Sequence, residues 1–189
     1  MSELNLKPIH LCFLDFETTG LDKERHDIID VAAVRVTGDP GPDWESTWRE
    51  TVVIDSKVKP AHPYVEPFVA RLNGYSPKAW EDARSLPDVL VELYDAINNS
   101  IICGSNPQFD YDFVKSGFEA LGWNFPRMLS HHKIDVPMLG IKMLLEGKVE
   151  KIRQNVLAQH FGLGEQEHRA MTDVRQCMEI FRKFLAPQL

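Results

Sequence analysis

The stretch Ile9-His10-Leu11-Cys12-Phe13-Leu14-Asp15-Phe16-Glu17 carries a nearly continuous apolar run that ends in two carboxylates. Such a run is typical of a buried strand. Because side chains alternate across a strand, Asp15 and Glu17 face one way and Phe16 the other. Two like charges this close repel unless a cation lies between them, so a hard divalent metal is their natural partner. The alternative is a solvated pair at a strand end, with Phe16 as a simple core residue.

The segments after this strand predict a layered α/β domain. Three early strands with short connections are typical of an antiparallel meander, and the later pattern alternates helices with short strands. The further strands are expected at Ile28 to Val36, Thr47 to Ile54, Ile101 to Cys103 and Lys133 to Val136, with a turn at Gly38 to Asp43. The helices are expected at Val65 to Leu72, Leu86 to Asn98, Phe109 to Leu121, Pro137 to Glu146, Arg153 to Phe161 and Arg169 to Leu185. We therefore expect a single domain over residues 1–189.

Composition and charge narrow the class of protein. The net charge is −7, and no basic stripe of the kind that coats long nucleic acids is evident. This charge does not exclude an enzyme that binds one end of a nucleic acid and uses bound cations to offset its carboxylates. No apolar run of about 18 residues appears, so we expect no membrane span. The start of the chain lacks a secretion signal, and three scattered cysteines are typical of reduced thiols, so we expect a cytoplasmic protein.

Asp110 is the next candidate, in Asn106-Pro107-Gln108-Phe109-Asp110. This segment follows a short strand and leads into a helix. An acidic residue there has a simple alternative role, because it complements the exposed amides and the dipole of a helix N-terminus. Asp112 competes for any functional role, but its helical position points it away from Asp110, so we expect it to face solvent.

His168 and Asp173 lie at the start of the last helix, five residues apart. Asp173 sits beside Ala170 and Cys177 by helical spacing, at the edge of the buried stripe. It is therefore either a boundary residue or a side chain aimed into a site. His168 alone could be an ordinary loop histidine.

Taken together, these five residues indicate a hydrolytic site. Four carboxylates and a histidine fall at strand ends or helix starts, where active sites of layered α/β domains collect. Oxygen ligands suit two Mg²⁺ ions, with Mn²⁺ as a substitute, and two such ions can clamp a phosphodiester. A histidine with an ordinary pKa near 6.5 can then take a proton from water.

The motifs resemble those of the DnaQ-like DEDDh exonuclease family, in the family's order and separation. The resemblance covers roughly Ile9 to Leu185 and rests on three segments: Leu14-Asp15-Phe16-Glu17-Thr18-Thr19-Gly20-Leu21, Asn106 to Asp110, and His168-Arg169-Ala170-Met171-Thr172-Asp173. A histidine five residues before the last aspartate is similar to the histidine branch. The second motif often begins His-Asn, whereas Ser105 stands here, so we expect contacts in the groove to differ at this position.

This resemblance implies a ribonuclease-H-like fold, an α/β domain with a five-stranded mixed β-sheet flanked by α-helices. It also implies a 3′-to-5′ exonuclease that releases nucleoside 5′-monophosphates. Asp15, Glu17 and Asp173 would hold the first metal, Asp15 and Asp110 the second, and His168 would be the general base. Thr18 and Thr19 would meet the 3′ end of the substrate, and Leu21 would lie against its terminal base. Asn106 and Phe109 complete the expected substrate contacts.

Three alternatives remain at the level of sequence. Exoribonuclease activity differs from the favoured activity on single-stranded or frayed DNA by only one or two contacts to a 2′-hydroxyl. A two-metal endonuclease on a related fold and a non-catalytic module that binds a partner are the others. Aromatic residues near the expected groove could stack on bases or simply pack: Phe109, Tyr75, Trp123 and Phe125. A homodimer is also considered, without a surface feature that demonstrates one.

Overall fold

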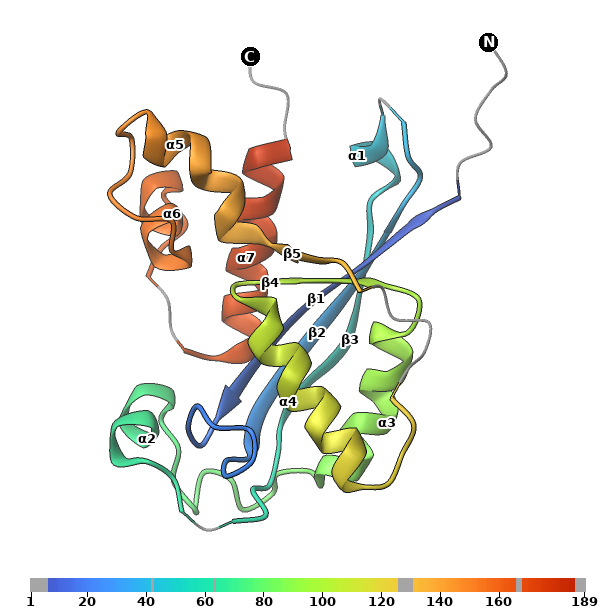
Figure 1. The fold of residues 1–189 in the computed structure, drawn as a ribbon, viewed down its shortest axis with the longest axis vertical. Helices are drawn as coiled ribbons and strands as arrows, with labels where there is room; N and C mark the ends of the chain where they lie inside the picture. The colour runs from blue at the N-terminus through green and yellow to red at the C-terminus, as the bar shows by residue number, and fades with distance from the viewer. Residues whose placement is uncertain (1–6, 42, 63, 126–130, 166–167, 186–189) are drawn as a thin grey trace.

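A computed structural model describes residues 7–41, 43–62, 64–125, 131–165 and 168–185 (Figure 1). Along the chain the elements are β1 (Ile9–Thr18), β2 (Ile28–Gly38), α1 (Trp44–Thr47), β3 (Arg49–Lys57), α2 (Pro67–Asn73), α3 (Leu86–Ile97), β4 (Ile101–Gly104), α4 (Pro107–Ala120), β5 (Lys133–Asp135), the 3₁₀ helix η1 (Val136–Gly140), α5 (Ile141–Leu145), α6 (Gln154–Phe161) and α7 (Ala170–Leu185). The strand order is β3-β2-β1-β4-β5. The first three strands are antiparallel, whereas β4 and β5 run parallel to β1. The predicted five-stranded mixed sheet flanked by helices is confirmed.

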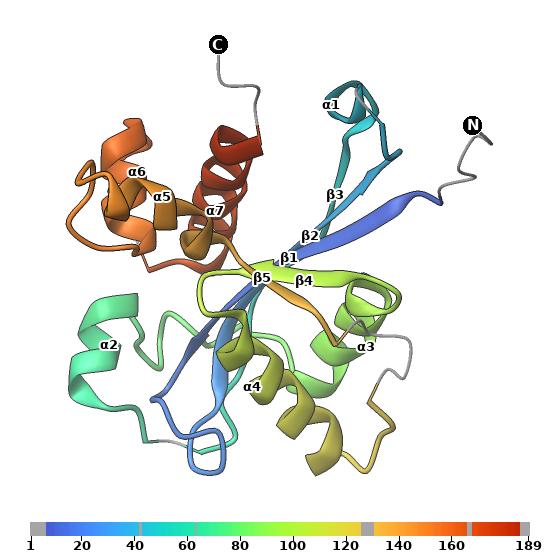
Figure 2. The ribbon, with the colours of Figure 1, turned by 45° about the horizontal axis from the view of Figure 1, so that its top comes forward.

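Alternation along β1 divides the core into two layers. Cys12, Leu14 and Phe16 pack in the cluster beneath α3 and α4. Leu11 and Phe13 pack in the cluster on the other face, beneath α6 and α7. Figures 1 and 2 show these two groups of helices on opposite sides of the sheet. The odd-numbered side chains of β1 therefore point toward α7, which decides where the two carboxylates at its end lie.

Two predicted segments differ from the structure in the type of element that they contain. The third strand begins at Arg49, because residues from Trp44 to Thr47 form the short helix α1 in the hairpin between β2 and β3. The helix expected from Pro137 is a 3₁₀ turn, η1, followed by α5. The junction between the two is closely packed, because a Cβ on Gly140 would lie 3.0 Å from the side chain of Leu157.

The three cysteines are buried free thiols, as predicted. Burial raises the pKa of Cys12 to about 12, so this thiol stays protonated. Within the described ranges, no helix combines the length and the apolar character that a membrane crossing requires.

Candidate active site

Asp15 and Glu17 lie at the end of β1, on the face of the sheet that α7 covers. Phe16, between them, is buried in the opposite layer, as alternation predicted. Both carboxylates are half-buried, and Glu17 pairs across the strands with Asp30 of β2. The end of β1 therefore presents two carboxylates toward the start of α7.

Asp110 approaches the same end of β1 from α4. The pairing of β1 with β4 runs only from Leu11 to Phe13, so the β4-side edge of β1 beyond it lacks that strand partner. The buried carboxylate of Asp110 accepts a hydrogen bond of 3.0 Å from the backbone N–H of Phe16. It thereby takes the place of a neighbouring strand, and this contact fixes the side chain beside Asp15 and Glu17.

Asp173 and His168 come from the start of α7. Asp173 is buried in the first turn of the helix, whereas His168 is half-buried and has a φ of 51°, in the left-handed region. One ligand atom each of Glu17, His168 and Asp173 lies within 4.8 Å of the other two, a spacing suited to a metal ion. The structure thus brings together residues that are separated by about 150 positions in the sequence.

The electrostatics of the cluster follow from burial and like charge. Burial raises the pKa of Asp15 well above its ordinary value, and Asp110, Asp173 and Glu17 raise it further. Burial, with Asp173 and Asp30, raises the pKa of Glu17 to about 7. Burial raises the pKa of Asp110 to about 8, although the Phe16 amide favours its charged form. Such a set favours the binding of cations, because a bound divalent ion replaces the protons that these groups otherwise hold.

The loop after β1 carries the residues expected to meet the substrate. The Thr18 hydroxyl donates to the carbonyl of Gly20 at 2.7 Å. The Thr19 hydroxyl accepts from the backbone N–H of Asp27 at 2.9 Å and contacts His26 Nδ1 at 3.2 Å. Both threonines are buried, so their hydroxyls shape the loop, and any substrate contact from them stays a prediction. Leu21 is 81% exposed at the tip, where a nucleobase could reach it.

The remaining predicted residues sit around α4. Asn106 caps the helix in a left-handed conformation, and its N–H donates to Asp135 at 3.3 Å. Phe109 packs on Phe113 with 4.7 Å between ring centroids, so part of its surface belongs to the core. Among the other aromatic candidates, Phe125 packs against the same core and Tyr75 against Trp80, whereas Trp123 is 38% exposed. Asp112 bonds to Gln108 at the surface.

Sequence reasoning missed Asp30, which lies beside the site in β2. It is 2% exposed, and its Oδ2 accepts from Arg169 Nε at 3.0 Å. The available signal was a single carboxylate inside Ile28-Ile29-Asp30-Val31, a stretch that is otherwise apolar. A buried charge of this kind needs a partner, and the partner lies 139 residues away.

A hollow of about 530 Å³ lies beside His168 on the α6 side. Its lining includes His168, together with Asn155 and Gln159 of α6. The lining is polar, and the volume falls in the range of small-ligand sites. This hollow places open space directly beside the histidine.

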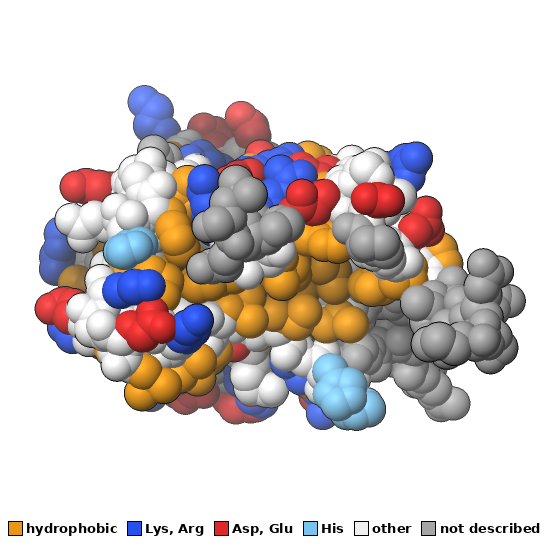
Figure 3. Space-filling model, turned by 90° about the horizontal axis from the view of Figure 1, so that it is seen from above, with side chains coloured by type: hydrophobic (Ala, Val, Ile, Leu, Met, Phe, Trp, Pro, Cys, Tyr) orange, Lys and Arg blue, Asp and Glu red, His pale blue; other side chains and the backbone are white. Residues whose placement is uncertain are grey.

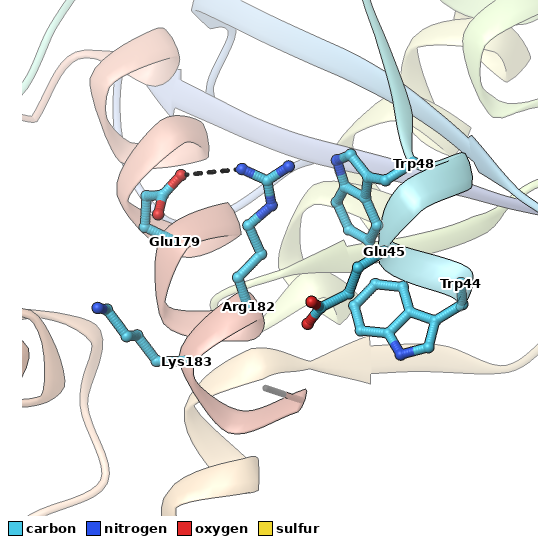
Figure 4. Close-up of a pocket in the computed structure, with 6 residues that line it drawn as sticks. All are labelled: Trp44, Glu45, Trp48, Glu179, Arg182 and Lys183. Carbon is cyan, nitrogen blue, oxygen red and sulfur yellow. Dashed lines mark hydrogen bonds and ion pairs between the residues drawn. The ribbon is translucent and has the colours of Figure 1, made fainter. Parts of the chain in front are cut away.

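Other hollows lie at the opposite end of the sheet, where β1 begins. Figure 3 shows hydrophobic side chains gathered on this end, where Ile9, Trp48 and Phe181 line an apolar hollow. In Figure 4, Trp48 and Trp44 approach α7, and the Arg182 guanidinium lies 5.1 Å from the centre of a Trp48 ring. These contacts dock the β2–β3 hairpin on α7, and the linings contain none of the acidic residues described above.

The comparison with protein families bears on the chemistry of this cluster. The profile of the RNase_T family, described as exonuclease, matches residues 12–181. The chain belongs to this exonuclease family. Its members are metal-dependent nucleases, so the predictions of a hydrolytic nuclease and of a DnaQ-like exonuclease are confirmed.

Curated relatives include much longer proteins. The PolC-type DNA polymerase III of Thermotoga petrophila is 29% identical over 179 residues, which is 91% of this chain and 12% of the relative. The corresponding protein of Staphylococcus haemolyticus is 26% identical over 187 residues, 97% of this chain and 12% of its own length. The chain thus spans about an eighth of these relatives.

Solved structures confirm the ribonuclease-H-like fold. Escherichia coli exonuclease I in complex with a dT13 oligonucleotide superposes with a TM-score of 0.72 at 18% identity, covering 93% of this chain and 41% of that chain. Exonuclease I from Methylocaldum szegediense superposes with a TM-score of 0.74 at 16% identity, covering 95% of this chain and 41% of that chain.

Proposed function

We propose that this exonuclease domain hydrolyses phosphodiester bonds from the 3′ end of single-stranded or frayed DNA and releases nucleoside 5′-monophosphates. The observation that carries the proposal is the convergence of Glu17, His168 and Asp173 within metal-binding distance, beside Asp15 and Asp110. The preference for DNA is supported by the relatives, which are named as DNA polymerases, and by the DNA oligonucleotide bound to a protein of the same fold.

The donor set fits two Mg²⁺ ions, with Mn²⁺ as a substitute. Asp15, Glu17 and Asp173 would hold one ion, and Asp15 with Asp110 the other, because these are hard oxygen donors clustered at one strand end. The bound ions would polarise the scissile phosphate and stabilise the charges that develop on its oxygens. The raised pKa values of Glu17, about 7, and of Asp110, about 8, fit groups that need cations to stay ionised at neutral pH.

The side chains of the protein supply the other parts of the reaction. His168 would accept the proton of the attacking water, and it is half-buried beside an open hollow. Leu21 would pack against the terminal base from the tip of its loop, while Thr18 and Thr19 hold that loop in shape and approach the 3′ end. Asn106 and Phe109 would line the path of the strand at the start of α4.

One experiment separates this proposal from its rivals. Purified protein is incubated with Mg²⁺ and matched single-stranded DNA, duplex DNA and RNA, each labelled at the 5′ end, and with a circular single strand. We expect stepwise shortening of the linear DNA, none with EDTA, and an intact circle. Cleavage of the circle would indicate an endonuclease, faster shortening of RNA an exoribonuclease, and no cleavage with Mg²⁺ or Mn²⁺ would refute the proposal.

Variants connect the activity to the site. Loss of a general base typically lowers the rate by about 10²–10⁴-fold. The nuclease activity of His168→Ala should therefore be lower than that of the wild-type protein by this factor. His160→Ala is the matched control, because His160 is an exposed histidine on α6 outside the cluster. Equal activity of the two variants would remove His168 from the mechanism. No feature of the residues that the structure describes supports a homodimer.

A further inference from the structure

A buried carboxylate that the proposed reaction does not use lies directly beside the site. Asp30 stands on β2 opposite Glu17 of β1, and only 2% of its surface is exposed. Burial of a carboxylate costs free energy unless charged or hydrogen-bonding partners surround it. Its partners therefore indicate what it does.

Those partners come from the two residues that follow His168. The Nε of Arg169 donates to Asp30 Oδ2 at 3.0 Å, and the backbone N–H of Ala170 donates to the same carboxylate. Ala170 is the first residue of α7. Asp30 thus connects β2 to the start of α7, at the two residues that directly follow His168 in the chain.

The backbone of His168 is the part of this turn that needs support. Its φ of 51° lies in the left-handed region, where a residue with a Cβ is unfavourable. Such a conformation persists when the surroundings hold it, and it is often found at functional sites. The ion pair of the next residue, Arg169, with Asp30 fastens this turn to β2.

We infer that Asp30 and Arg169 form a positioning pair that holds His168 over the acidic cluster. The inference rests on the proposed function, in which His168 takes a proton from water. The pair touches no reacting atom in this scheme: Asp30 is buried under the turn, and Arg169 acts through the backbone that it shares with His168.

The same helix offers a matched control. Arg175 of α7 donates to Glu50 of β3 at 2.6 Å, so it is also an ion pair between α7 and the sheet. Arg175 and Arg169 are similarly exposed, at 42% and 47% of their side chains. Removal of either arginine should loosen α7 to a similar degree, but only Arg169 adjoins His168.

The test compares kcat and KM of Arg169→Ala, Asp30→Asn, the double variant and Arg175→Ala at saturating Mg²⁺. Loss of an outer contact of this kind typically costs about 10–100-fold, and we expect that loss in kcat for each change at the pair. KM should stay within about twofold, because no substrate contact is removed. The double variant should match the single variants, since both residues act through one contact, and Arg175→Ala should retain wild-type kcat.

Three outcomes of these kinetic measurements would overturn the inference. The first is a kcat of Arg169→Ala equal to that of Arg175→Ala. The second is a multiplication of the two losses in the double variant, which would mean that the residues act separately. The third is a rise in KM for Arg169→Ala that Asp30→Asn does not share, which would make Arg169 a direct contact to the substrate phosphates.

A spectroscopic measurement keeps this inference separate from the proposed function. The imidazole Cε1–H signal of His168, assigned by its loss in His168→Ala, should shift or broaden in Arg169→Ala and stay in place in Arg175→Ala. An unchanged signal in Arg169→Ala would refute the positioning role, even for an active enzyme. If the wild-type protein released no nucleotide, the proposed function would fail, and this spectrum would still decide whether the pair positions His168.

Discussion

Replacement of Asp110 separates its structural contact from its charge. The Oδ1 of Asp110 accepts the backbone N–H of Phe16 at 3.0 Å in a buried setting. Asp110→Asn keeps an acceptor in that place and removes the carboxylate, whereas Asp110→Ala removes both. Both variants should lose activity, because each removes an oxygen donor that we assign to a metal ion.

The stabilities of the two variants should differ in a defined direction. A buried N–H left without an acceptor costs about 1–3 kcal/mol. The higher helix propensity of Ala returns about 0.7 kcal/mol, so Asp110→Ala should be less stable than Asp110→Asn by roughly 0.3–2.3 kcal/mol. For a domain of this size that is roughly 1–10 °C in the melting temperature. In EDTA above pH 8, Asp110→Asn should melt above the wild-type protein, because burial raises the pKa of Asp110 to about 8 and its charged form is unfavourable there.

The assay is thermal unfolding in EDTA at pH 8.5, followed by circular dichroism, with nuclease activity measured in parallel. Asp112→Asn and Asp112→Ala are the controls, because Asp112 lies on the same helix and bonds to Gln108 at the surface. Their melting temperatures should differ by little more than helix propensity. An Asp110→Ala variant as stable as Asp110→Asn would refute the structural role of this contact, and an active Asp110→Asn would refute the role of the charge.

Two further predictions concern metal linkage and packing. Burial raises the pKa of Glu17 from 4.5 to about 7 and that of Asp110 from 3.8 to about 8, so the folded state holds protons that the unfolded state has released. The metal-free protein should therefore lose stability as the pH rises from about 4 to 8, and Mg²⁺ should restore most of the loss at pH 8. An unfolding free energy that rises with pH over this range in EDTA would contradict this prediction. Gly20→Ala should destabilise the protein by about 1–3 kcal/mol, because its Cβ would lie 2.5 Å from the ring of His26. Gly38→Ala is the control, since its Cβ would meet its nearest neighbour at an ordinary 3.6 Å, and equal melting temperatures for the two variants would show that the loop relaxes freely.

Local sequence patterns were sufficient to predict the strand and the helices that position the site. The apolar run from Ile9 to Leu14 predicted β1, and alternation placed Asp15 and Glu17 on one face, where the structure has them. The starts of α4 and α7 were predicted to within two residues, because Pro107 and the buried stripe after Ala170 are local signals. What joined these segments into one site was the motif pattern of a family, since spacing alone left each residue with an ordinary structural alternative.

Long-range partners could not be predicted from the sequence. Asp30 was hidden in an apolar strand because the residue that explains it, Arg169, lies 139 positions away. Helix α1 was missed because a four-residue helix in a Gly- and Pro-rich hairpin has almost no periodicity of its own. Its place depends instead on contacts such as that of Trp48 with Arg182 of α7.

The arrangement of the acidic residues around β1 has a consequence for folding. Asp110 reaches the end of β1 from the helices on one face of the sheet, and Asp173 reaches it from α7 on the other. Without cations, like charges between the two layers oppose their close approach, and the raised pKa of Asp15 reflects that opposition. Apolar packing on both faces, by Phe13 on one and Phe16 on the other, holds the strand end in place against this repulsion. A bound ion would turn the same carboxylates into a link across the sheet, so metal binding and the stability of this end of the domain should rise and fall together.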